Sequence, residues 1–579
     1  MYENPEQITY FATTNSRGKE TPFGIKRKDR ARHMYIIGKT GMGKSTLLEN
    51  MAIQDIRNGE GMAFIDPHGS TADRILEYVP KHRLNDVVYF APFDMEHPVA
   101  FNVMEDVGYD KRHLVVSGLL SAFRKIWVDA WSARMEYILS NTLLALLEYP
   151  GATLLDVNRM LINKNFRKKV VDNVQDPLVK SFWVDEFANY TDRYTQDATP
   201  AIQNKVGQFT SNPLIRNIVG QAKSSFDIRE IMDERKILIM NLSKGRVGEV
   251  NATLLGSMLV TKIYLAAMSR ADVSADTLRN LPNFYFYVDE FQNFANESFS
   301  DILSEARKYK LNLTIAHQYV EQMEEEVRDA VFGNVGTTVA FRVGPFDAET
   351  LEKIFEPQFN ATDLVNLGFA QIYLTLMIDG VGSPPFSATT LPPWDPPPER
   401  YTEDVIAASR AQFGKPRAEV QTLIDEWVRS DPVVQEAPKP KYGARSNGNN
   451  APRSNPEPRP TPPPVPVVQE KPYVHVEAPR APAPKDPHEL GERLAHKHEM
   501  AQSKAMRPEP PAPRAPQQPP KPKLEGANSL KDALAAIQRN RPTLHSSKES
   551  PDQHPKRSER PPLSKEEMAA MLAVDETDR

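Results

Sequence analysis

The sequence predicts an α/β fold, in which a parallel sheet is flanked by helices, a helical segment is inserted, and a proline-rich tail follows. Apolar runs typical of buried strands alternate with helical segments of about 10 to 15 residues, which is the pattern of a parallel sheet. From residue 107 to 230 the apolar periodicity is helical instead. Most of the 50 prolines follow residue 390, where apolar residues become too sparse to form a core.

The composition limits which classes of protein and which kinds of site are possible. The 579 residues are enough for two or three domains, and the absence of cysteine excludes disulfides, thiolate metal sites and cysteine nucleophiles. The net charge is −5, but residues 439–560 carry 22 basic and 13 acidic side chains, so the rest of the chain is acidic. This balance neither indicates nor excludes a nucleic-acid partner.

No segment has the pattern of a signal peptide or a membrane span. The N-terminus lacks a basic region followed by an apolar core, and nowhere do 18 uncharged apolar residues run together. The nearest candidate, residues 254–268, is interrupted by Lys262 and has the apolar spacing of a buried helix face. We therefore expect a cytoplasmic protein with no intrinsic membrane span.

The chain opens with a short apolar stretch around Tyr10, followed by a basic run at residues 26–32. We favour a solvated turn for the basic run, because runs of charge are usually solvated, and keep a DNA or nucleotide contact as the alternative. The first core strand is expected directly afterwards, at residues 34–37.

A glycine-rich stretch with the form of a P-loop, or Walker A motif, follows that strand and precedes a predicted helix. It consists of Gly38, Lys39, Thr40, Gly41, Met42, Gly43, Lys44, Ser45 and Thr46. The glycines let backbone N–H groups point at phosphate oxygens, and the helix N-terminus adds partial positive charge. We expect Lys44 to reach the β- and γ-phosphates and Ser45 to bind Mg²⁺. An incidental glycine-rich turn would leave eight matched positions unexplained.

The remaining strands are predicted from apolar runs. The second strand, residues 61–66, ends at Asp66, which places this carboxylate at the edge where parallel sheets bind ligands. Further parallel strands are expected at residues 87–90, 236–242, 284–290, 311–316 and 337–342, and residues 372–377 are expected to close an antiparallel edge.

Two acids end the buried strand that starts at Phe284, which is the form of a Walker B motif. Asp289 is expected to hold Mg²⁺ through water, and Glu290 to polarise the water that attacks the γ-phosphate. Acids at a strand end are also common as helix caps, but an upstream P-loop favours the catalytic interpretation.

The strand at residues 311–316 is expected to neighbour the Walker B strand and to lead into Gln318. Gln318 can sense the γ-phosphate or align the water, and a polar strand cap is its alternative. Arg307, before that strand, is our first candidate for an arginine finger that acts on a neighbouring subunit, followed by Arg342 and Arg216. An ordinary surface arginine remains the alternative for each.

Together these motifs resemble the DNA-binding ATPase domain of type IV secretion coupling proteins, the conjugation motors of the HerA/FtsK superfamily. The resemblance covers about residues 8–395 and rests on GKTGMGKS, FIDPHG, VDEFQNF and the segment from Ala306 to Gln318. It implies a RecA-like sheet, a ring hexamer with ATP and Mg²⁺ between subunits, and DNA in the central channel. By the same resemblance Gln318 is the sensor, and Arg307 matches the finger position.

The resemblance gives a domain map. The RecA-like ATPase domain is expected at residues 1–106 and 231–395, with an all-alpha domain inserted at 107–230. A helical extension is expected at 396–432, with helices near 402–413 and 417–429. Residues 433–579 are expected to be a disordered proline-rich tail with short helical segments, which either flicker or fold on a partner.

The function expected on these grounds is ATP-driven translocation of DNA through a homo-hexameric ring. One alternative is a HerA-like motor for DNA repair or packaging, and another is a nucleotide-gated receptor that recruits proteins to a secretion channel. Members of the family usually carry N-terminal membrane helices, whereas this chain starts almost at the ATPase. Docking at the inner face of the cell membrane through relaxase or secretion-channel proteins therefore stays open.

Overall fold

The computed structural model of the protein describes residues 4–16, 19–295 and 298–430. The predicted tail, residues 433–579, lies outside the described residues. Everything that follows refers to the described part of the chain.

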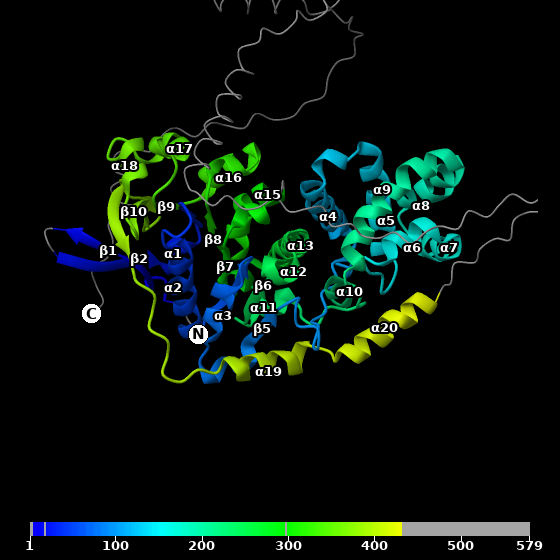
Figure 1. Ribbon diagram of the computed structural model, residues 1–579, viewed down its shortest axis with the longest axis horizontal. Coiled ribbons are helices and arrows are strands. Elements are labelled where there is room, and N and C mark those ends of the chain that lie inside the picture. Colours follow the sequence, from blue (N-terminus) through cyan, green and yellow to red (C-terminus); the bar gives the residue numbers. More distant parts are fainter. Residues whose placement is uncertain (1–3, 17–18, 296–297, 431–579) are drawn as a thin grey trace, which may run out of the picture. The chain divides into compact units, whose positions relative to one another are not determined.

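An eleven-stranded mixed sheet forms the centre of the fold, in the order β2-β1-β13-β10-β9-β3-β8-β7-β4-β6-β5 (Figure 1). The seven strands from β9 to β5 are mutually parallel, and the four from β2 to β10 pair antiparallel. The strands are β1 (Ile8–Ser16), β2 (Lys19–Lys26), β3 (Met34–Ile37), β4 (Gly61–Asp66), β5 (Val87–Phe90), β6 (Ile237–Asn241), β7 (Phe284–Val288), β8 (Leu311–His317), β9 (Thr337–Ala340), β10 (Gln371–Thr375) and β13 (Phe386–Thr390).

The predicted fold class is confirmed, since each of the seven expected parallel strands begins within one residue of its predicted start. The prediction of an antiparallel edge at residues 372–377 is wrong in one respect. β10 does pair antiparallel with β9, but β13 and the β1–β2 hairpin continue the sheet beyond it. The hairpin escaped prediction because β2 is exposed over its first half and is interrupted by Pro22 and Gly24, so it lacks an apolar run.

Helices cover both faces of the sheet, and a separate apolar core lies on each face. On one face α2 (Lys44–Arg57), α3 (Ser70–Leu76) and α19 (Thr402–Phe413) contribute residues such as Leu48, Ile75 and Val405. On the other face α13 (Glu249–Met268), α15 (Ser298–Glu305) and α16 (Glu325–Asn334) share a core with the helices that follow β5.

Eight α-helices lie between β5 and β6, in the segment expected to be helical (Figure 1). They are α4 (Arg112–Ile126), α5 (Ala133–Leu147), α6 (Asp156–Ile162), α7 (Lys164–Asn173), α8 (Pro177–Ser181), α9 (Asp192–Ser211), α10 (Pro213–Val219) and α11 (Ile228–Asp233). We call α4–α10 the helical segment. It packs on the sheet-covering helices chiefly through α4, which contacts α13 and α15.

One helical stretch, Glu249–Asp272, is long and apolar enough to cross a membrane by length and composition. Inside the fold, 78% of its most apolar window is buried. Leu255, Met258, Leu259 and Ile263 all lie in the core, as expected for a buried helix face. The stretch therefore has the burial of a core helix.

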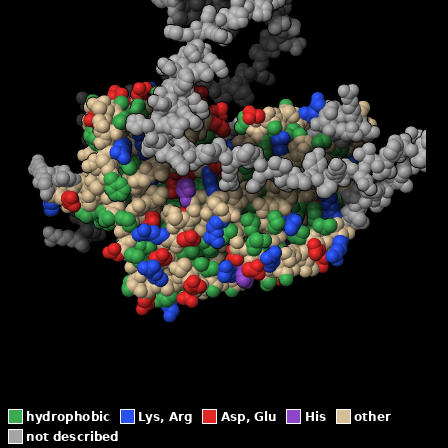
Figure 2. Space-filling model, in the orientation of Figure 1, with side chains coloured by type: hydrophobic (Ala, Val, Ile, Leu, Met, Phe, Trp, Pro, Cys, Tyr) green, Lys and Arg blue, Asp and Glu red, His purple; other side chains and the backbone are tan. Residues whose placement is uncertain are grey.

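The two C-terminal helices are confirmed at their predicted positions and contact different parts of the chain. α19 packs on β5, whereas Val420 and Ile424 of α20 (Arg417–Arg429) pack on Leu155 in the helical segment. Figure 2 shows acidic and basic side chains interspersed over this side of the molecule. Several form ion pairs with the sheet region, including Arg410 with Asp94 at 2.6 Å.

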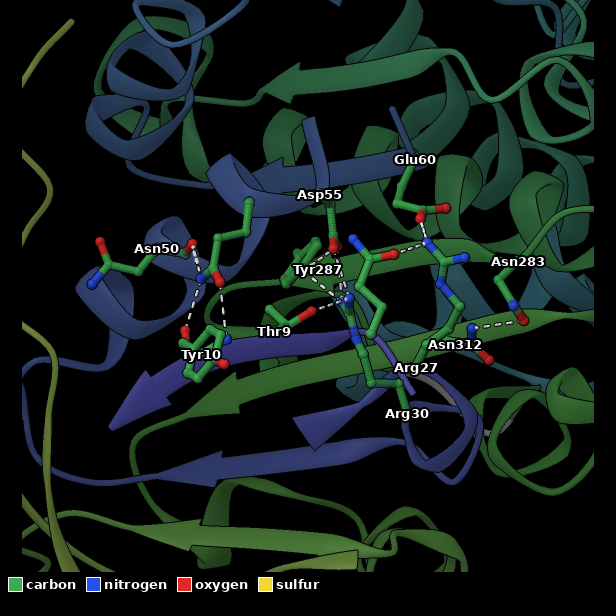
Figure 3. A network of polar contacts seen from close by, with 12 residues as sticks. Thr9, Tyr10, Arg27, Arg30, Asn50, Asp55, Glu60, Asn283, Tyr287 and Asn312 are labelled. Carbon is green, nitrogen blue, oxygen red and sulfur yellow. Dashed lines mark hydrogen bonds and ion pairs between the residues drawn. The ribbon is translucent and has the colours of Figure 1, made fainter. Parts of the chain in front are cut away.

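The basic run at residues 26–32 is only in part the solvated turn that we expected, because Lys28 and Arg32 alone are exposed in it. It forms α1 (Arg27–Arg30), in which both arginines are buried (Figure 3). Arg30 makes two hydrogen bonds to the Asp55 carboxylate, at 2.6 and 2.8 Å, and Arg27 pairs with Glu60. The two carboxylates lie 25 and 33 residues away in the sequence from the arginines that they pair with. The basic run itself therefore gives no sign that its arginines have carboxylate partners.

The buried Arg30–Asp55 pair connects α1, α2 and the Walker B strand β7. The Tyr287 hydroxyl donates to Asp55 at 2.5 Å and accepts from Arg30 at 2.7 Å, while the Arg30 guanidinium lies 3.6 Å from the centre of the Tyr285 ring. Because both ions are buried and hydrogen-bonded to each other, losing one partner would leave an uncompensated buried charge. This network fixes the P-loop helix against β7.

We predict that Asp55→Ala lowers the free energy of unfolding by about 3 to 5 kcal/mol, because Arg30 keeps its charge and loses its counter-ion. Chemical denaturation measures the loss. The control is the double variant Arg30→Met/Asp55→Leu, which removes both charges and is expected to be more stable than the single variant. A single variant as stable as the parent would show that the pair is not needed.

A second prediction concerns acid stability. Burial, assisted by the Arg307 charge, lowers the pKa of His33 to about 4. Between that value and the ordinary pKa of about 6.5, only the unfolded chain binds the proton, so stability falls as the pH falls, by roughly 1.4 kcal/mol per pH unit. His33→Asn should flatten this dependence, since asparagine tolerates the φ of +59° and can accept the hydrogen bond from the Leu313 N–H.

Denaturation midpoints at pH 7.5 and pH 5 measure this effect. His317 is also buried with a pKa lowered to about 4, so the variant should remove only part of the pH dependence. An unchanged pH dependence in His33→Asn would contradict the assignment.

Candidate nucleotide-binding site

The P-loop connects the end of β3 to the start of α2 at the carboxyl edge of the parallel strands. Gly41 and Gly43 have φ values of +77° and +116°, a region that side chains other than glycine rarely adopt. A Cβ at Gly38 would lie 2.5 Å from the Cβ of Phe341, so this glycine is needed for close packing. The loop therefore has the glycines that a phosphate cradle requires.

Lys44 is buried, and its ammonium points back into the loop. Its Nζ donates to the Gly38 carbonyl at 2.7 Å and lies 3.4 Å from the Lys39 carbonyl. Burial lowers the pKa of Lys44, opposed by the nearby charges of Glu290 and Asp289. The N-cap Gly43 supplies no side-chain cap, so the first N–H groups of α2 are available to an anion.

Ser45 and Asp289 face one another across the site, with 2.8 Å between Ser45 Oγ and Asp289 Oδ2. Burial raises the pKa of Asp289 to about 6. A hydroxyl and a carboxylate suit Mg²⁺, which prefers oxygen ligands and fills its remaining positions with water and phosphate. The described residues hold no cluster of three or more His, Asp or Glu that could enclose a metal.

Glu290 has a left-handed backbone, with φ of +47°, and a side chain held by two amides. Gln292 Nε2 donates to Glu290 Oε2 at 2.6 Å, and Gln318 Nε2 donates to Oε1. Burial raises the pKa of Glu290, but His68, Gln318 and Gln292 outweigh this and lower the pKa to about 2. Glu290 is thus an ionised carboxylate whose direction is set by its neighbours.

Gln318 links the P-loop to Glu290. Its Oε1 accepts a hydrogen bond from Thr40 Oγ1 at 2.9 Å, while its amide nitrogen contacts the carboxylate. This bridge spans the region between the phosphate cradle and the acid, as a residue that aligns a water molecule would.

His68 is a site residue that the sequence interpretation did not identify. Its Nε2 lies 3.9 Å from Glu290 Oε1, and the interaction with Glu290 raises the pKa of His68. The signal was present in the Asp-Pro-His-Gly turn after β4. Asp66 ends β4 at the carboxyl edge of the sheet, as expected, and its carboxylate accepts from the backbone N–H groups of Thr71 and Ala72 at the start of α3.

The three candidate arginines lie in different places. Arg307 is exposed in the 3₁₀ turn before β8, at the opposite end of that strand from Gln318. Arg342 follows β9, and its carbonyl accepts from the Lys39 N–H at 2.8 Å. Arg216 lies in α10 of the helical segment. Only Arg342 is therefore near the P-loop of its own chain.

Comparisons with solved structures found matches of low sequence identity. The conjugative coupling protein TrwB without its first 70 residues is 15% identical, with 68% of this chain and 90% of that chain covered and a TM-score of 0.49. TrwB in complex with ADP and Mg²⁺ is 15% identical, with 69% and 92% covered and a TM-score of 0.49. VirB4 of Thermoanaerobacter pseudethanolicus is 12% identical, with 69% and 99% covered and a TM-score of 0.44.

A search of curated proteins found no match. The sequence model of the type IV secretion-system coupling protein DNA-binding domain matches residues 21–356. This match spans more than half of the chain and includes the P-loop, both Walker B acids and Gln318. The chain therefore belongs to the family of type IV secretion-system coupling protein DNA-binding domains.

Proposed function

We propose that this protein is an ATP-driven motor that translocates DNA. The observation that carries the proposal is the polar cluster at the sheet edge, in which Thr40, Gln318 and Glu290 form a hydrogen-bonded chain beside the Ser45–Asp289 pair. Membership of a family of coupling-protein DNA-binding domains supports DNA as the substrate. Contacts to phosphate would serve such a motor, because they bind DNA irrespective of sequence.

Each residue of the cluster has a proposed role in ATP hydrolysis. Lys44 and the loop N–H groups bind the phosphates, and Ser45 and Asp289 hold Mg²⁺, with Asp289 acting through water. Bound Mg²⁺ would neutralise charge on the β- and γ-phosphates. Glu290 accepts a hydrogen bond from the attacking water and polarises it, and Gln318 keeps that carboxylate aligned with Thr40 of the P-loop.

We propose a ring hexamer with a nucleotide at each subunit boundary. Residues 1–106 and 231–395 would form the ATPase domain, 107–230 the inserted all-alpha domain and 396–432 a helical extension. A cytoplasmic location, with docking on secretion-channel or relaxase proteins, agrees with the family and with a need for ATP. Turnover that rises when DNA is added would separate this motor from a receptor that uses hydrolysis as a switch.

The first functional prediction concerns two residues of the proposed site, the phosphate-binding Lys44 and the carboxylate Glu290. Lys44→Ala should lower ATP turnover by roughly 10²- to 10³-fold or more, because the developing charge on the γ-phosphate loses its cationic partner. Glu290→Gln should bind ATP and stall before hydrolysis. Steady-state turnover and binding of a fluorescent ATP analogue measure the two effects. Parent-like turnover by Glu290→Gln would refute the proposed role of Glu290.

The second functional prediction concerns Arg307. The site of its own chain is at the other end of β8, so any contact of Arg307 with phosphate requires a neighbouring subunit. Arg307→Ala should leave ATP binding nearly intact and lower turnover by about 10³- to 10⁵-fold in the assembled ring. Lys308→Ala is the matched control, because Lys308 is the adjacent exposed cation and pairs with Glu305 at 3.4 Å.

Mixing of subunits decides whether Arg307 acts in trans. Arg307→Ala subunits lack the finger and Lys44→Ala subunits lack the phosphate clamp, so mixed rings regain some interfaces with both groups. Activity should then partly return. No recovery in rings shown to be mixed would assign Arg307 a structural role and direct attention to Arg342.

A further inference from the structure

Lys125 connects the helical segment to the loop that carries the catalytic carboxylate. It lies in the last turn of α4, and its ammonium donates hydrogen bonds to the carbonyl of Gln292, at 2.5 Å, and to that of Ala295. Both carbonyls belong to residues 291–295, which we call the Walker B loop. Lys125 is half-buried, and this burial lowers its pKa to about 8.

The Walker B loop in turn holds Glu290. The Gln292 amide donates to the Glu290 side chain at 2.6 Å, and the Asn293 amide donates to the Glu290 carbonyl at 2.9 Å. The left-handed backbone of Glu290 is unfavourable for a non-glycine residue, so it must be maintained by contacts of this kind. A displacement of the loop would therefore redirect the carboxylate.

Other contacts secure the loop without the help of Lys125. Phe291 and Phe294 are fully buried, and Lys244 in α12 (Lys244–Val247) donates to the Asn293 side chain at 2.9 Å. The loop should therefore remain folded when the Lys125 ammonium is removed. What Lys125 adds is a connection to α4, which belongs to the helical segment.

We propose that Lys125 is a positioning residue for ATP hydrolysis, through which the position of α4 in the helical segment sets the orientation of Glu290. The inference rests on the proposed function and deepens it, because it names a route by which substrate bound to the helical segment would regulate turnover. The route runs from the Lys125 ammonium to the Gln292 carbonyl, and from the Gln292 side chain to the Glu290 carboxylate.

Lys125→Met tests the proposal, because methionine keeps an apolar stem of similar length and lacks the ammonium. We expect kcat for ATP to fall roughly 10- to 100-fold, as for a small misplacement of a catalytic group, while KM and the affinity for an ATP analogue change less than about twofold. Lys125→Arg should restore part of kcat, since a guanidinium can also donate to both carbonyls. Thermal unfolding of each variant is measured in parallel.

Lys111→Met is the matched control. Lys111 also connects the region around α4 to the end of the buried helix, through a 2.5 Å contact with Asp272, but it does not touch the Walker B loop. Its kcat should equal that of the parent. If the parent hydrolyses ATP and Lys125→Met keeps the same kcat, this inference is overturned and the proposed function stands. A parent without ATPase activity would overturn both.

A double-mutant cycle keeps the test valid even if Lys125→Met also loses stability. Because Lys125 is argued to act through Gln292, the double variant Lys125→Met/Gln292→Leu should have a kcat close to that of Gln292→Leu alone. If the fold losses in kcat of the two single variants multiply in the double variant, Lys125 affects turnover by another route and the proposal is refuted.

Discussion

The candidate site depends on the parallel pairing of β3, β8 and β7. Ile37 lies opposite His317 in one pair of strands, and Val288 lies opposite Ile315 in the other. Since parallel strands end at the same edge, the residues that follow them meet there. The phosphate loop lies more than 200 residues before the two acids and the bridging glutamine, and the hydrogen-bond register of the sheet brings them together.

Neighbouring carboxylates in this cluster have opposite pKa shifts, although they are adjacent in sequence. Burial raises the pKa of Asp289 to about 6, although Ser45 Oγ and the Glu290 N–H both donate hydrogen bonds to its carboxylate. Burial also raises the pKa of Glu290, but His68 and the amides of two glutamines outweigh it and lower the pKa to about 2. Two neighbouring acids whose pKa values differ in this way can take different roles in a reaction. A nearby cation would favour the ionised form of Asp289, whereas the groups around Glu290 already keep that side chain ionised.

Local patterns in the sequence predicted much of this arrangement, and distant partners account for what it missed. The parallel strands were predictable because a strand buried on both faces is a continuous apolar run, as β3 and β7 are. The P-loop and the acids carry their spacing within a few residues. Arg30 was misinterpreted because Asp55 and Tyr287, which neutralise it, lie elsewhere in the chain. Lys125 gave no signal, since its partners are backbone carbonyls of a loop 167 residues away.

The course of the two C-terminal helices limits how the helical segment can move. The chain leaves the sheet for the helical segment after β5 and returns to the sheet at β6. These two chain connections alone would let the helical segment rotate about the line that joins them. α20 adds a third attachment, where the Trp427 indole donates to Asp156 at 2.8 Å and Arg159 lies against the Trp427 ring. Because α19 is held on β5, rotation would have to stretch the short connection at residues 414–416 or detach Trp427. Any rotation of the helical segment would therefore have to break this contact of α20 in addition to the packing of α4 on α13 and α15.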